Sequence, residues 1–171
     1  MIPLDSPRWS DIECTRGPAV RVPELLRAIY ANPYPCERHS VQGEIWTDLW
    51  DLLCHQETIS SASFAAVLHL VEAALTAKPG ILHWSIVLLP ASIERSRLQH
   101  NQFASTKPPE EIDPDYFDAI LRLKKVYAKT AKWGRNPELA RAVTEARRLL
   151  SKPRAKIPPK QKSDFGPLFS Q

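Results

Sequence analysis

Glycine, cysteine and long apolar runs are scarce in this chain of 171 residues, which has 5 glycines and 3 cysteines. Few glycines beside 16 prolines argue against a β-rich fold full of glycine turns, and favour helices separated by proline. No window approaches about 18 uncharged apolar residues, so the sequence predicts no membrane span. The opening residues MIPLDSPRWSDIE contain neither a basic region nor an apolar run, so we expect no signal peptide.

The motifs of common enzyme, cofactor and metal sites are also missing. The sequence contains no G-x-G-x-x-G, Walker A, G-x-S-x-G, H-E-x-x-H or C-x-x-C pattern. None of the histidines is followed by another His or Cys three or four residues later, so a zinc site would have to be assembled from distant parts of the chain, and we expect no metal and no cofactor; the histidines are His39, His55, His69, His83 and His100. Cys54 and His55 are helix neighbours that point about 100° apart and cannot act as a catalytic pair. We therefore expect a protein that is not an enzyme.

The small number of cysteines indicates the cellular compartment in which the protein is found. Cys14, Cys36 and Cys54 are too few and too scattered for a disulfide framework. Such a composition is typical of a reducing compartment, so the sequence predicts a cytoplasmic protein.

The net charge of +4 resides in the C-terminal segment. Residues 152–171 carry five basic groups against Asp164, whereas the other 151 residues are neutral overall. Within that neutral part, residues 1–118 sum to −7 and residues 119–151 to +7. Such polarity can steer a charged partner, although ordinary solvated surface charge explains it equally well.

Apolar residues recur with helical spacing through most of the chain. The expected helices cover 23–31, 44–54, 61–77, 81–89, 113–133 and 137–150. The run 81–89 also fits a strand; we favour a helix that Pro90 ends or kinks, with a polar helical continuation over 91–105. Capping residues mark three helix starts: Ser60 or Ser61, Asp113 before Pro114, and Asn136 before Pro137.

These stretches predict an all-α fold in a single domain over residues 1–151. The turns between helices are short, so antiparallel helix pairs are expected, stacked as a short α-solenoid or as an irregular bundle. The first 22 residues are expected to be irregular. Helix 61–77 is almost entirely small or apolar, which places it at the centre.

Two groups of residues are candidates for partner binding in the domain. Acidic residues that could meet a basic partner gather around residue 114: Glu110, Glu111, Asp113, Asp115 and Asp118. Helix capping explains two of them, and a solvated loop could explain the rest. Trp46 and Trp50 lie one turn apart and are expected in the core, whereas Trp9, Trp84 and Trp133 are candidate binding residues wherever they are exposed.

The basic, proline-rich tail over 152–171 has no apolar periodicity and is expected to be extended. It ends in a hydrophobic tip formed by Phe165, Leu168 and Phe169. The tip could dock onto a partner or fold back over an apolar groove of the domain, and we favour the second because exposed aromatics invite association. Its QKSDF segment faintly resembles the Gln-led motifs that bind sliding clamps, with Asp164 in place of an apolar residue.

The segment 45–74, IWTDLWDLLCHQETISSASFAAVLHLVEAA, resembles a segment of bacterial HEAT-like helical proteins. The matching residues are Trp46, Leu49, Trp50, Leu53, His55, Gln56, Ala62, Ser63, Ala65, Ala66, Leu70 and Val71. LDSPRWSDI and VPELLRAI near the N-terminus are similar to the start of such proteins. Proteins of this kind accompany polymorphic toxins, and the resemblance implies an immunity protein that neutralises a cognate toxin by binding it.

The functional expectation is therefore a protein-binding module that needs no chemistry of its own, with a toxin or another protein as partner and no membrane. The alternative is a nucleic-acid-associated protein that binds through the basic residues between Lys124 and Lys162, with Trp133 stacking on bases.

Overall fold

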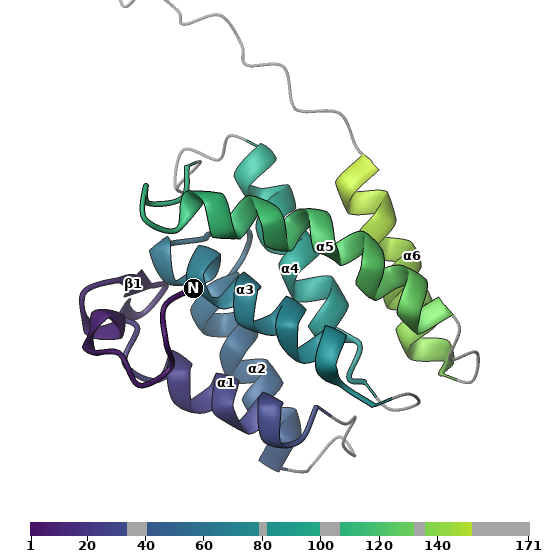
Figure 1. The fold of residues 1–171 in the computed structure, drawn as a ribbon, viewed down its shortest axis with the longest axis horizontal. Coiled ribbons are helices and arrows are strands. Elements are labelled where there is room, and N and C mark those ends of the chain that lie inside the picture. The colour runs from purple at the N-terminus through teal and green to yellow at the C-terminus, as the bar shows by residue number, and fades with distance from the viewer. Residues whose placement is uncertain (34–40, 79–81, 100–106, 132–135, 152–171) are drawn as a thin grey trace, which may run out of the picture.

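The computed structural model describes residues 1–33, 41–78, 82–99, 107–131 and 136–151. Within these ranges the chain is all-α, as predicted, apart from a small two-stranded sheet. The helices are α1 (Val22–Ala31), α2 (Val41–Leu53), α3 (Ser61–Thr76), α4 (Ser85–Leu98), α5 (Asp113–Ala131) and α6 (Pro137–Ser151) (Figure 1). No helix in the described part is long and apolar enough to cross a membrane.

Helix α3 is the centre of the bundle. Its apolar residues surround the helix on all sides, and twelve of its residues are buried. It contacts α1, α2, α4 and α5, so the arrangement is an irregular bundle, one of the two architectures left open by the sequence. Small residues at Ala62, Ala65 and Ala66 have almost no exposed surface, which lets the neighbouring helices approach closely.

The turn between α2 and α3 is tight and specific. Ser63 Oγ accepts a 2.9 Å hydrogen bond from the Ser60 N–H and donates a 2.7 Å bond to the Leu53 carbonyl, which confirms Ser60 as the helix cap. Gln56 and Glu57 take left-handed backbone conformations, with φ of 48° and 66°. The turn closes through a 2.8 Å bond from the Thr58 N–H to the His55 carbonyl.

Helix α4 resolves the ambiguity of residues 81–89. The helix begins only at Ser85 and passes through Pro90 to Leu98, so Pro90 does not end it, and the expected helical continuation after Pro90 is confirmed as far as Leu98. Pro90 and its neighbours Leu89 and Ala91 are buried. Burial of this stretch offsets the backbone hydrogen bond that proline cannot donate.

Helices α5 and α6 begin differently from each other. Asn136 Oδ1 accepts a 3.0 Å bond from the Leu139 N–H, as expected of an N-cap. Asp113 is instead the first residue of α5, and its Oδ1 is buried with no hydrogen-bond partner among the described residues, so its expected capping bond is not formed. Figure 1 shows α5 crossing in front of α4, along the outside of the bundle.

The N-terminal segment is more ordered than the sequence predicts. It contains a 3₁₀ helix at Pro7–Ser10 and a hairpin of β1 (Glu13–Cys14) with β2 (Gly17–Pro18). Gly17 has a φ of 111°, which suits glycine in so short a turn. Trp9 is buried and its indole N–H donates a 2.9 Å bond to the Pro3 carbonyl, so this segment belongs to the core.

Candidate functional site

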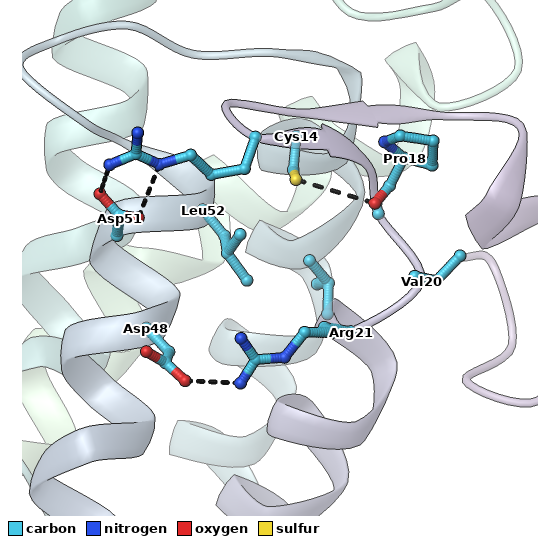
Figure 2. A pocket seen from close by; sticks show the side chains of 10 residues that line it. Cys14, Pro18, Val20, Arg21, Asp48, Asp51 and Leu52 are labelled. Carbon is cyan, nitrogen blue, oxygen red and sulfur yellow. Dashed lines mark hydrogen bonds and ion pairs between the residues drawn. The ribbon is translucent and has the colours of Figure 1, made fainter.

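A cavity of about 220 Å³ lies between the N-terminal hairpin and α2 (Figure 2). Arg16 Nε and Nη2 contact both oxygens of Asp51 at 2.8 and 2.7 Å, and Arg21 Nη2 contacts Asp48 at 2.8 Å. The hydrogen bonds from Arg16 lower the pKa of Asp51 below its usual value. Each arginine therefore already holds a carboxylate, and the pairs tie the hairpin and the start of α1 to α2.

The cysteine of this cavity is not placed for chemistry. Cys14 is buried, and its Sγ lies 3.9 Å from the Pro18 carbonyl, a weak S–H donor contact. Cys54, the second free cysteine in the described part, is buried beside Ser96, and burial raises the pKa of its thiol. Cys54 therefore favours the protonated, unreactive form.

A second surface feature runs along the contact between α4 and α6. One hollow of about 310 Å³ is lined by Trp84, Leu88, Glu138, Arg141, Ala142 and Glu145. Another of about 150 Å³ is lined by residues that include Trp50, Arg95, Gln99 and Leu149. The second hollow is lined mainly by α4 and by Trp50, Cys54 and Glu57 from α2 and the turn after it, and Leu149 is its one lining residue from α6. We call this feature the α4–α6 groove.

Trp84 is the aromatic anchor of the α4–α6 groove and is only partly buried. Its ring lies 5.1 Å from His83 and 6.4 Å from Trp50, measured between ring centroids. His83 in turn stacks on Trp46 at 5.0 Å with an interplanar angle of 11°. The indole N–H of Trp50 donates a 3.0 Å bond to Ser85 Oγ. These contacts restrict the positions that the Trp84 ring can take.

The rim of the α4–α6 groove carries charges of both signs. Glu138 and Arg141 are exposed on α6, and Arg95 flanks the second hollow from α4. An apolar centre with an aromatic residue, surrounded by charged residues, is the usual anatomy of a protein-binding surface. Of the two candidate tryptophans that the structure describes, Trp84 lies at a hollow and Trp9 is buried.

The predicted acidic residues lie around the start of α5, and all of them except Asp113 have an ion-pair partner among the described residues. Glu111 contacts Arg8 at 3.1 Å, Asp115 contacts the N-terminal amine of Met1, and Asp118 lies 3.9 Å from Arg122. The exposed Glu110 lies 3.8 Å from Lys107. Much of the negative charge is therefore balanced internally, which weakens this cluster as a site for a basic partner.

The basic residues of the nucleic-acid alternative are partly engaged as well. Arg148 Nε donates a 2.6 Å bond to Glu145, and Arg147 lies over the Tyr127 ring at 5.8 Å. Lys129 donates to the Ala77 carbonyl at 2.8 Å. Trp133 and the tail residues Phe165, Leu168 and Phe169 lie outside the described residues.

The histidines also do not assemble a site in the described part of the chain, where no group of three or more metal-ligating residues is found. His69 on α3 is a hydrogen-bonded core residue: its Nε2 lies 2.9 Å from the Ile2 carbonyl. Burial lowers the pKa of His69, so the ring stays neutral and anchors the N-terminal segment.

Comparisons with protein-family models, curated proteins and solved structures give no match to this chain. The fold and the α4–α6 groove therefore define only a class, an all-α protein with an aromatic-anchored surface groove.

Proposed function

We propose that the chain is a non-catalytic protein-binding module that holds a partner protein in the α4–α6 groove. The observation that carries the proposal is Trp84, a partly exposed indole fixed by His83 and Trp50 at the centre of a groove. Tryptophan contributes more binding energy at protein interfaces than most residues, especially when it needs no reordering.

The partner that fits the proposal is a folded or helical protein segment with an apolar ridge and charges on both sides. The ridge would cover Trp84 and Leu88, while the flanking charges would pair with Glu138 and Arg141. The resemblance of residues 45–74 to immunity proteins makes a cognate bacterial toxin the proposed partner. Neutralisation would then follow from covering the surface of the toxin.

The test is an affinity capture from the source cells with the tagged full chain, followed by mass spectrometry. Trp84→Ala and Arg141→Glu change the groove, and Val20→Ala is the matched control because Val20 is 62% exposed and lies elsewhere. We expect one stoichiometric protein, at least about tenfold less of it with Trp84→Ala, and unchanged capture with Val20→Ala.

Three outcomes would contradict the proposal. If the Trp84→Ala chain captured as much partner as the native chain, the groove would not be the binding surface. Capture of no specific protein would contradict the protein-binding function. If nucleic acid were captured instead, and the amount captured fell steeply as the salt concentration rose, the nucleic-acid alternative would be favoured. Circular dichroism of each variant shows whether it is folded.

A further inference from the structure

Phe117 and Leu121 form an exposed apolar pair on the outer face of α5. Phe117 is 38% exposed and Leu121 is 65% exposed, and they lie one helical turn apart. Arg97 lies over the Phe117 ring at 5.0 Å and fixes its position from the α4 side. Among the described residues, these are the only two large exposed apolar side chains that are neighbours on one helix face.

The exposed residues of α5 also follow a seven-residue repeat. Residues seven apart lie within about 20° of each other around a helix, which places Asp118 beneath Lys125 and Phe117 beneath Lys124. The complete outer stripe is Pro114, Phe117, Asp118, Leu121, Lys124, Lys125 and Ala128. Its positions are symmetric about Leu121, while its charge changes from negative before Leu121 to positive after it.

We propose that two copies of this chain associate through the outer faces of α5, antiparallel, around a two-fold axis close to Leu121. Antiparallel alignment brings the negative half of each stripe against the positive half of the other. A stripe with opposite charges on either side of an apolar centre is self-complementary, as a two-fold interface requires. A parallel arrangement would instead place like charges together.

The contacts of this pair follow from the stripe. Leu121 meets its own copy at the centre. Asp118 lies beside the partner's Lys125, and Phe117 lies opposite the partner's Lys124, each contact occurring twice. Asp118 is available because its side chain is 66% exposed and its internal pair with Arg122 is long, at 3.9 Å. Packing of the lysine stem on the ring adds a cation–π contact at Phe117.

The expected dimer is weak. The stripe from 114 to 128 spans about 22 Å of one helix, so the buried area falls at the low end for specific interfaces. A dissociation constant in the micromolar range is therefore expected. None of the stripe residues lines the α4–α6 groove, so dimerisation and partner binding use separate surfaces, and each can fail without the other.

Sedimentation equilibrium of the full chain, from low-micromolar to sub-millimolar concentration, is the first test. We expect a monomer–dimer equilibrium for the native chain and at least about tenfold weaker association for Leu121→Asp. Val20→Asp is the control, because it introduces the same charge at another exposed apolar residue and should leave association unchanged. A native chain that stays monomeric throughout would overturn the proposal.

A charge-exchange experiment tests the antiparallel geometry itself. Asp118→Lys places lysine against lysine in its own dimer, and Lys125→Asp places aspartate against aspartate, so each variant alone should be monomeric. When they are mixed, both contacts become lysine against aspartate, and a heterodimer should form. No association in the mixture, or dimers of either variant alone as strong as the native dimer, would overturn the proposal. If the chain formed larger oligomers, or a dimer that substitutions in α5 did not weaken, association would occur through another face and the proposal would be wrong.

Discussion

The hydroxyl of Tyr116 on α5 donates a 2.7 Å hydrogen bond to Oε2 of Glu94 on α4, and both residues are buried. Arg97 holds the same carboxylate through two bonds of 2.6 and 2.7 Å. Burial and the negative charge of Glu94 raise the pKa of Tyr116 well above its ordinary value, so the hydroxyl keeps its proton and remains a donor. This hydrogen-bond network links α4, which lines the groove, to α5, which carries the proposed dimer face.

Glu94→Ala is expected to lower the free energy of unfolding by about 3–5 kcal/mol, because it leaves the Arg97 side chain, which is only 10% exposed, without its carboxylate partner. Tyr116→Phe, which removes one hydrogen bond and leaves Arg97 paired, should cost about 1–2 kcal/mol. Urea unfolding followed by circular dichroism measures both values.

Glu145→Ala is the matched control for this prediction, since Glu145 and Arg148 form a similar pair with the same spacing at an exposed position. It should cost less than about 1 kcal/mol. Equal losses for Glu94→Ala and Glu145→Ala would contradict the structural role of the buried network.

Stability is predicted to fall with acid below pH 6.5 because of His83. Burial lowers the pKa of His83 from 6.5 to about 4, and its Nδ1 accepts a 3.2 Å bond from the Ser85 N–H. Between these values the unfolded chain binds the proton and the folded chain does not, so stability rises with pH through this window. The contribution of the partly exposed ring is about 1–2 kcal/mol.

His83→Asn should flatten the dependence of unfolding free energy on pH between 6.5 and about 4, since asparagine cannot take up a proton. His69, whose pKa burial also lowers, leaves part of the slope in place. Trp46→Phe alters the stacking on His83 without removing the titrating group, so it should lower stability and keep the slope. An unchanged slope in His83→Asn would refute the assignment.

The capping bond at the start of α6 gives another quantitative expectation. Asn136→Ala removes the acceptor for the Leu139 N–H and should cost about 1 kcal/mol, whereas Asn136→Asp keeps an acceptor and should cost much less. Thermal unfolding of the three chains measures the difference. Equal melting temperatures for the native and alanine chains would contradict the cap.

Local patterns in the sequence predicted most of the helical fold. The apolar sequence of α3 and the Asn136-Pro137 start of α6 are readable from neighbouring residues alone. The hairpin at residues 13–18 was missed because strands of two residues carry no periodic pattern. The backbone at Gln56 and Glu57 was missed because neither residue type favours a left-handed conformation.

The candidate site was harder to predict because it depends on distant parts of the chain. Trp84 could be named as a candidate, but its groove exists only because α6 packs on α4 more than 50 residues later. Similarly, the acids near α5 look available until Arg8 and the N-terminal amine reach them from the other end of the chain. No spacing rule reveals such partners in advance.

Site-specific photo-crosslinking in living cells tests the proposed function most directly. A photo-crosslinking amino acid replaces Arg141 on the rim of the α4–α6 groove in one chain, and the exposed Val20 in a second. The account predicts that the chain altered at 141 crosslinks to one protein, identified by mass spectrometry as a toxin domain, and that the chain altered at 20 does not. A partner crosslinked at position 20 and not at 141, or at neither, would contradict it.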